Sequence, residues 1–164
     1  ADVMSDCEGP CAPGCTMDML GNGKCESQCS QAECNWDYRD CECATVLDSC
    51  DGIIDDGSDI TSSYDDNLHR CWLIRPKVRA SRIMLHWTRF DTEEGFDFVF
   101  VNDGQSEMDP LLTPEEGLSG KLIDRRGEER WPPDLNSSSG ELLIRFHTDP
   151  TESTGSGFEF EWTC

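Results

Sequence analysis

The run Gly157-Phe-Glu-Phe-Glu-Trp162 alternates apolar and acidic side chains. In an extended backbone, successive side chains point to opposite faces, so the three aromatic side chains would share one face and the two glutamates the other. This is the pattern of a half-buried β-strand. Earlier runs of the same β-type character occupy residues 71–75, 82–87, 96–101 and 140–146.

Turn-forming residues separate these runs. They are Asn-Asp-Gly at 102–104, Glu-Gly at 116–117, Arg-Gly at 126–127 and Asn-Ser-Ser-Ser-Gly at 136–140. The charged segment 115–136 shows no clear pattern, and we expect a long connection there. Many short strands without helical periodicity predict a mainly β fold, an antiparallel β-sandwich or jelly roll.

The chain divides into two unlike halves. Its 164 residues would fit one domain, or a small module joined to a domain of about 110 residues. Residues 1–44 carry almost no periodic apolar pattern, whereas the strand-like runs all fall within 45–164. A segment of the first kind needs disulfides, a metal ion or both to hold a fold. We therefore predict a small cysteine-rich module at 1–44 and a β-sandwich at 45–164.

The cysteine content indicates an oxidising compartment. Eleven cysteines are present, and nine of them lie between Cys7 and Cys50. Zinc sites favour Cys-x2-Cys pairs, and this sequence contains none. Disulfides are the better interpretation, so we expect the chain to be extracellular, either secreted or part of a cell-surface ectodomain.

The charge of the chain excludes several classes of partner. The net charge is −21, from 34 acidic and 13 basic side chains. Nucleic acids and anionic membrane surfaces need a basic surface, so neither is an expected partner. No apolar run approaches the roughly 18 residues that span a bilayer, and we expect no membrane insertion. Ala1 has the character of a mature N-terminus, although a cut boundary would look the same.

Oxygen-bearing side chains in the first module suggest a calcium site. The module has the pattern Cys11-x3-Cys15-x9-Cys25-x3-Cys29-x4-Cys34-x6-Cys41. Asp37 and Asp40 lie on its last loop, and Asn22 lies in a Gly-Asn-Gly turn. Hard oxygen ligands on tight loops suit Ca²⁺. The alternative is that these residues only form turns.

The same module resembles the Lin-12/Notch repeat (LNR) family. The resemblance rests on the six cysteines and on the ending Cys34-Asn-Trp-Asp-Tyr-Arg-Asp-Cys41. It implies one of the 15 pairings that six cysteines allow. The implied bonds are Cys11–Cys34, Cys15–Cys29 and Cys25–Cys41, and the implied Ca²⁺ ligands are Asn22, Asp37 and Asp40. The family's first acidic ligand has no residue in strict register, and Asp18 is the nearest candidate.

The second half resembles a CUB domain, a jelly-roll sandwich of about 110 residues. The resemblance rests on an ordered set of motifs that includes Cys71-Trp-Leu-Ile74, Asp91-Thr-Glu-Glu-Gly-Phe-Asp97 and Phe146-His-Thr-Asp149. It implies a Ca²⁺ site formed by Glu93, Asp97 and Asp149, with Tyr64 beside it. It also implies that this acidic loop receives a lysine of a protein partner, so these four residues are the expected partner-binding set. Independently of the family, three carboxylates brought together would repel unless a cation joined them.

Five cysteines lie outside the six-cysteine pattern. Cys50–Cys71 is the first expectation, although Cys43 could replace Cys50. A bond Cys7–Cys43 would leave Cys164 unpaired, whereas Cys43–Cys164 would tie the module to the last strand. Because eleven is odd, one thiol must be free or bonded to another chain. Either the protein continues past Cys164, or the odd thiol forms an intermolecular bridge.

These features favour a binding protein over an enzyme. No metalloprotease, serine hydrolase or phosphate-loop motif occurs, so we expect no catalytic activity. The first hypothesis is a calcium-dependent extracellular recognition or adhesion module. The second is a structural subunit that assembles head-to-tail into a filament or matrix, and the third is the non-catalytic part of a secreted protease. Asn136, in the only Asn-x-Ser/Thr sequon, is a candidate glycosylation site.

Overall fold

The computed structural model describes residues 11–20, 22, 26, 28–29, 32–34, 45–58, 61–151 and 154–164. The chain splits into two compact units, Ala1–Glu42 and Cys43–Cys164. The boundary that we predict after residue 44 lies outside the described residues.

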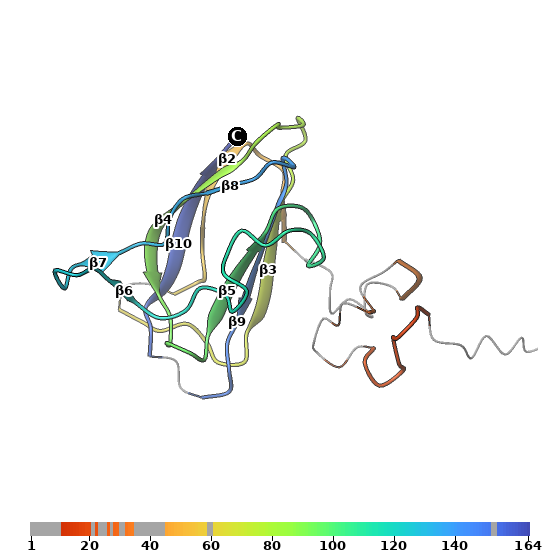
Figure 1. The fold of residues 1–164 in the computed structure, drawn as a ribbon, viewed down its shortest axis with the longest axis horizontal. Coiled ribbons are helices and arrows are strands. Elements are labelled where there is room, and N and C mark those ends of the chain that lie inside the picture. The colour runs from red at the N-terminus through yellow and green to blue at the C-terminus, as the bar shows by residue number, and fades with distance from the viewer. Residues whose placement is uncertain are drawn as a thin grey trace, which may run out of the picture. The chain divides into compact units, whose positions relative to one another are not determined.

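The second unit is a sandwich of two four-stranded sheets, as the sequence predicts (Figure 1). One sheet has the order β1-β3-β9-β5, formed by Thr45–Leu47, His69–Ile74, Leu142–His147 and Phe98–Asn102. The other has the order β2-β10-β4-β8, formed by Asp51–Asp55, Gly157–Thr163, Met84–Asp91 and Leu135–Asn136. All pairings within the two sheets are antiparallel except that of β1 with β3, which is parallel.

The core lies between the two sheets and follows from the alternation in the strands. In β10, Phe158, Phe160 and Trp162 are buried, whereas Glu161 is exposed. Trp87 of β4 is fully buried, and its ring centroid lies 5.5 Å from that of Phe160 in an edge-to-face arrangement. Burial of aromatic side chains of this size supplies most of the driving force for such a fold.

Residues 115–136 are not the single long connection that we expect from the sequence. They contain a two-stranded ribbon, β6 (Leu122–Ile123) paired with β7 (Glu129–Arg130), which projects from the sandwich in Figure 1. Asp124 closes its turn, because one carboxylate oxygen accepts hydrogen bonds from the backbone N–H groups of Arg126 and Glu128. The sequence does not predict this strand pair, because the segment is rich in charged and turn-forming residues and has little apolar alternation.

A disulfide closes one end of the sandwich and corrects our predicted pairing. Cys50 is bonded to Cys164, so the expected Cys50–Cys71 bond and the expected unpaired Cys164 are both wrong. Antiparallel pairing of β10 with β2 places Thr163 opposite Asp51, and the next step brings the two cysteines to a Cα–Cα distance of 5.0 Å. That separation is typical of a disulfide. Cys71 is also disulfide-bonded, to a partner other than Cys50.

In the described part of the first unit, two disulfides lie at a small buried core. The bonds Cys11–Cys34 and Cys15–Cys29 are present as the LNR resemblance implies. Cys25–Cys41 and Cys7–Cys43 fall outside the described residues. The described secondary structure of this unit is one short 3-10 helix, Ala32–Cys34. Across the described part of the whole chain, no helix is long and apolar enough to cross a membrane.

Candidate metal centre

Three carboxylates meet at one end of the sandwich. Glu93 and Asp97 lie on the loop between β4 and β5, and Asp149 follows β9. Each offers one oxygen atom, and these oxygen atoms all lie within 4.8 Å of one another. The sheet brings them together because β5 pairs with β9, and the backbone N–H of Asp149 donates to Asp97 Oδ1 at 3.0 Å.

The loop that carries Glu93 and Asp97 is tightly built. The N–H of Asp97 donates to the carbonyl oxygen of Glu93 at 3.1 Å, so the two acidic residues close one turn. Gly95 has a φ of 80°, which this turn requires and which glycine adopts without strain. Ser119 holds the loop from the other side, because its hydroxyl donates to the Glu93 carbonyl at 3.0 Å and accepts from the N–H of Gly95 at 2.9 Å.

Tyr64 supports this loop from inside the protein. Its hydroxyl donates to Asp97 Oδ2 at 2.5 Å and accepts from the N–H of Glu93 at 2.8 Å. Only 5% of Tyr64 is exposed, so we assign it a positioning role in place of the expected contact with a partner. Burial, and then the hydrogen bond to Asp97, raise the pKa of Tyr64 far above its usual range, so the hydroxyl stays protonated and can donate.

The electrostatics of the cluster favour a cation. No lysine, arginine or histidine among the described residues forms an ion pair with any of the three carboxylates. Glu93 Oε2 is buried without a hydrogen-bond partner. Burial raises the pKa of Glu93, and the negative charges of Asp149, Asp97 and Asp66 raise it further. A bound cation would offset the repulsion between the carboxylates. It would also replace the hydration that the buried Glu93 oxygen has lost.

The size and chemistry of the cluster fit Ca²⁺. Its ligands would be hard carboxylate oxygens, which Ca²⁺ and Mg²⁺ prefer to nitrogen or sulfur. Ca²⁺ lies about 2.3–2.6 Å from its oxygen ligands, so two ligands of one ion are at most about 5 Å apart. The measured limit of 4.8 Å satisfies this requirement before any adjustment.

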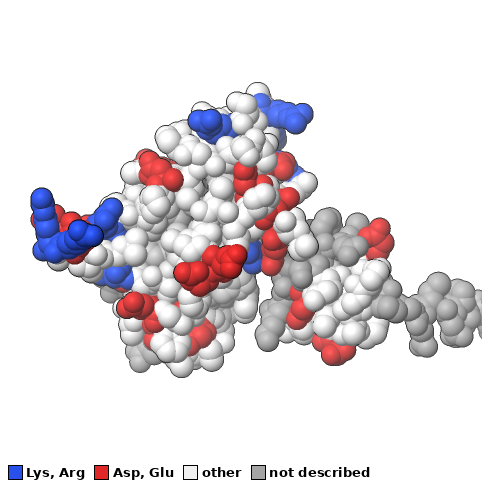
Figure 2. All heavy atoms as spheres, in the orientation of Figure 1, with Lys and Arg blue, Asp and Glu red and all other residues white. Residues whose placement is uncertain are grey.

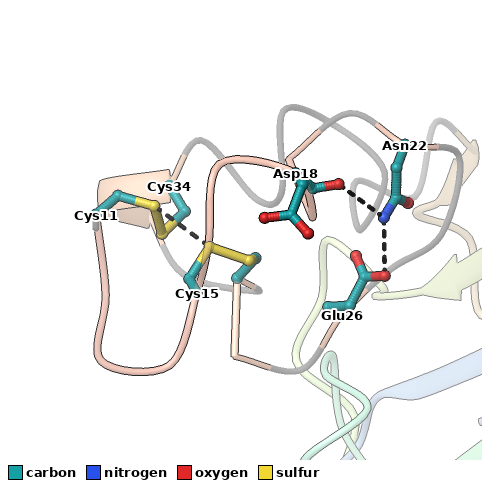
Figure 3. The surroundings of a disulfide bond; sticks show 7 residues. Cys11, Cys15, Asp18, Asn22, Glu26 and Cys34 are labelled. Atoms are coloured by element: carbon teal, nitrogen blue, oxygen red, sulfur yellow. Dashed lines mark hydrogen bonds between the residues drawn. A yellow bond between two sulfur atoms is a disulfide. The ribbon is translucent and has the colours of Figure 1, made fainter. Parts of the chain in front are cut away.

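The predicted site of the first unit is described only in part. Asp18 and Asn22 are both exposed, and Asn22 Nδ2 lies 3.5 Å from the carbonyl oxygen of Asp18 (Figure 3). Asn22 Nδ2 also donates to Glu26 Oε1 at 3.0 Å, which adds an acidic residue that the sequence analysis missed. Its position directly after Cys25 is the signal that could have found it. Asp37 and Asp40 lie outside the described residues.

The remaining sequence candidates lie elsewhere. Asn136 is exposed on β8, at the edge of its sheet, and pairs with Met84. The hydroxyl of Ser138, the third residue of the sequon, donates to Asp103. Figure 2 shows the acidic side chains in several separate groups; basic side chains lie where Figure 1 places β6 and β7 and also along the top of the view.

Comparisons with known proteins give the family of each unit. Residues 43–162 match the CUB domain family, and residues 5–42 match the LNR domain family. The chain is 32% identical over 136 residues to an astacin-like metalloendopeptidase from Gallus gallus, covering 80% of this chain and 30% of that protein. It is 34% identical over 104 residues to the human multiple epidermal growth factor-like domains protein 8, covering 63% of this chain and 3% of that protein.

Solved structures show the same fold for the second unit. A crystal structure of the MASP-1 CUB2 domain bound to Ca²⁺ superposes with a TM-score of 0.57 at 15% identity, covering 74% of this chain and 98% of that one. The CUB1-EGF-CUB2 region of human MASP-1/3 gives a TM-score of 0.56 at 18% identity, over 73% of this chain and 41% of that one. CUB and LNR domains are extracellular, and CUB domains mediate protein–protein interactions. This chain belongs to the CUB domain family and carries an LNR domain before its CUB domain.

Proposed function

We propose that this chain is a non-catalytic, calcium-dependent protein-binding module whose CUB unit binds Ca²⁺ through Glu93, Asp97 and Asp149. The observation that carries the proposal is the convergence of three carboxylate oxygens within 4.8 Å. No described basic side chain neutralises them. The Ca²⁺ in the structurally similar MASP-1 CUB2 domain supports the same ion here.

The ion would organise a surface for a positively charged side chain. Asp97 is fully buried and fixed by Tyr64 and the Asp149 N–H, so it would act as the anchoring ligand. Glu93 and Asp149 are half-buried and remain accessible from outside. With their positions fixed by the ion, their outer oxygens could accept charge-assisted hydrogen bonds from a partner's lysine ammonium. Phe96 on the same loop is 58% exposed and offers an apolar contact beside them.

Calcium titration tests the metal part of the proposal. We expect the chelator-stripped chain to take up one Ca²⁺ in the CUB unit, with a Kd on the order of 10⁻⁴–10⁻³ M, as in other extracellular modules. Asp97→Asn should abolish this event in calorimetry. Asp124→Asn is the matched control, since that carboxylate closes the β6–β7 turn and should not affect Ca²⁺ uptake. Unchanged uptake by Asp97→Asn would disprove the site.

A lysine peptide tests the binding part separately. In NMR spectra of isotope-labelled chain, pentalysine should shift the amide signals of the 92–97 loop when Ca²⁺ is present. The shifts should disappear in chelator and in Asp97→Asn. A pentaglutamate peptide is the control and should leave these signals in place. If Ca²⁺ binds but pentalysine shifts no loop signal, the metal site stands and the proposed recognition of lysine fails.

A second candidate function is that of an accessory region in a secreted protease. The similarity to the chicken metalloendopeptidase favours it, because the chain covers 30% of that protein. The coding sequence on either side of this chain would decide between the two. The filament hypothesis loses its covalent support at Cys164, which is bonded to Cys50 within the chain. Light scattering at rising concentration would test for non-covalent assembly.

A further inference from the structure

Two histidines face each other on neighbouring strands of the β1-β3-β9-β5 sheet. His69 of β3 and His147 of β9 are direct partners in the strand register. Their Nδ1 atoms lie 2.7 Å apart, and their ring centroids are 4.8 Å apart with an angle of 72° between the planes. At this distance only one of the two nitrogens carries a proton, so the other presents a lone pair toward it.

The strand pairing fixes both histidines at the backbone. Beyond the pair, the N–H of Thr148 donates to the carbonyl oxygen of Leu68 at 3.0 Å, and the N–H of Leu68 donates to the hydroxyl of Thr148 at 2.7 Å. On the far side of His147, Phe98 of β5 is its partner in the register. Ligands on paired strands are held more precisely than ligands on loops.

Two imidazole nitrogens in this arrangement are close to the geometry of a chelating pair. Zinc–nitrogen bonds of about 2.0–2.1 Å at a tetrahedral angle place two ligand nitrogens about 3.3 Å apart. The measured separation is 2.7 Å, so the rings need to open by only about 0.6 Å. His69 is exposed, so its ring has room to turn and water can complete the coordination.

Charged side chains also lie near the two histidines. Arg145, two residues before His147, places a positive charge near its ring. Its guanidinium is occupied by Glu107, with the two atoms 2.8 Å apart, and it lies 5.0 Å above the ring of Phe100. Glu107 therefore offsets the positive charge of Arg145 beside the histidine pair.

We propose that His69 and His147 form a second metal site on the CUB unit, one that binds a borderline divalent transition ion such as Zn²⁺ through two imidazole nitrogens. Imidazole suits Zn²⁺, Cu²⁺ and Ni²⁺ and is a poor ligand for Ca²⁺. When the ion binds both Nδ1 atoms, the proton that lay between the rings moves, by exchange with water, to Nε2 of the ring that carried it, so both imidazoles remain neutral. This site is chemically distinct from the carboxylate cluster and does not depend on it.

The test is a Zn²⁺ titration of the full chain in saturating Ca²⁺. Calcium keeps the carboxylate cluster occupied. Because the chain has an odd number of cysteines, any free thiol is alkylated beforehand. We expect binding of one Zn²⁺, with changes in the ring-nitrogen NMR signals of His69 and His147. His69→Ala and His147→Ala should each lower the affinity by about tenfold or more, since each leaves a single ligand in place of a chelate.

His86→Ala is the matched control. His86 is the third histidine of the chain and lies on β4, in the other sheet. Its Nδ1 lies 2.6 Å from a carboxylate oxygen of Asp134. This variant should bind Zn²⁺ as tightly as the unmodified chain. The proposal is overturned if no Zn²⁺ binds, or if His86→Ala lowers the affinity while His69→Ala does not. Neither outcome would bear on the calcium site.

Discussion

The two units of this chain are stabilised by different interactions. In the LNR unit the described buried core consists of Ala12 and three cysteines, all of which form disulfides. In the CUB unit the buried core is built from large apolar side chains, among them Trp87, Phe146 and Phe158. Because a short segment cannot bury enough apolar surface, covalent constraint takes the place of a core in the first unit.

The two candidate calcium sites reflect the same difference. In the CUB unit, paired strands and a buried tyrosine place the carboxylates before any ion arrives. In the LNR unit, Asp18, Asn22 and Glu26 lie on short segments between cysteines, and the described residues include no strand there. We therefore expect Ca²⁺ to be needed for folding in the first unit and mainly for binding in the second.

The largest effect should come from removing one disulfide of the LNR unit. The Cys15–Cys29 bond spans 14 residues, and the chain-entropy model assigns such a loop about 3 kcal/mol. A unit with so small a core cannot lose that amount and stay folded, so Cys15→Ser/Cys29→Ser should unfold the LNR unit and leave the CUB unit intact. Hydrogen exchange with mass spectrometry would show this as lost protection confined to residues 1–42.

The matched double variant is Cys50→Ser/Cys164→Ser in the CUB unit. This bond spans 114 residues and is worth about 5 kcal/mol in the same model, yet the large core should keep the sandwich folded at a lower melting temperature. Continued protection of the LNR unit in the first variant would contradict our account of how it is stabilised.

Truncation of the central tryptophan should have the next largest effect. Trp87→Ala removes a fully buried ring that contacts Phe90, Phe158 and Phe160, and should cost about 3–5 kcal/mol in the CUB unit. Trp87→Phe should cost less, because it keeps a buried aromatic ring at this position; both variants remove an indole N–H that has no hydrogen-bond partner in the structure. Denaturant unfolding followed by hydrogen exchange would measure both. Equal losses in the two variants would show that a phenyl ring at this position recovers none of the packing of the indole.

A smaller and more local loss should follow from Tyr64→Phe. The change removes the donor to Asp97 and the acceptor for the Glu93 N–H, at a cost of about 1–3 kcal/mol. Ca²⁺ should bind more weakly to the CUB unit, since the ligands lose their support. Calorimetry would measure the change, with Asp124→Asn as a variant that should show none. Unaltered Ca²⁺ affinity would limit Tyr64 to a role in stability.

Alternation in the sequence was enough to predict the strands that form the core. The predicted runs at 140–146 and 157–162 correspond to β9 and β10. Strand β2 was missed because its only large apolar residues, Ile53 and Ile54, are adjacent and its ends are aspartates. It lies at a sheet edge, where charged residues discourage further pairing. Gly52 also belongs to it, since the ring of Trp162 occupies the place of a Cβ atom.

Cysteine pairing shows where the sequence argument stops. The CUB resemblance implies a bond of Cys71 with Cys50, or with Cys43 in its place. The actual partner of Cys50 is Cys164, and only the register of β2 against β10 makes these two residues neighbours. The acidic cluster has the same origin, because the β5–β9 pairing brings Asp149 to a loop more than fifty residues earlier. Spacing predicts local sites, whereas sites joined across a sheet require the register.

Acidification should produce the smallest of these effects, and it should act on the CUB site through Glu93. Burial and three neighbouring carboxylates raise the pKa of Glu93 above its usual value of about 4.3. Protons then compete with Ca²⁺ from a higher pH than an ordinary glutamate would allow. We expect the Ca²⁺ affinity to fall as the pH is lowered toward the raised pKa of Glu93, by less than tenfold per pH unit for one proton.

The sign of this effect reverses when the ion is absent. A carboxyl group whose pKa is higher in the folded state binds protons more tightly there, so lowering the pH through that pKa adds to the stability of the ion-free fold. Glu93→Gln should flatten both pH dependences, which calorimetry and thermal unfolding at each pH would show. Retention of the full pH dependence of Ca²⁺ binding in this variant would assign the proton competition to a different carboxylate. The ion and the proton would then be competing for Asp149 or Asp97, and the half-buried Glu93 would act as a partner-facing residue rather than the ligand that senses pH.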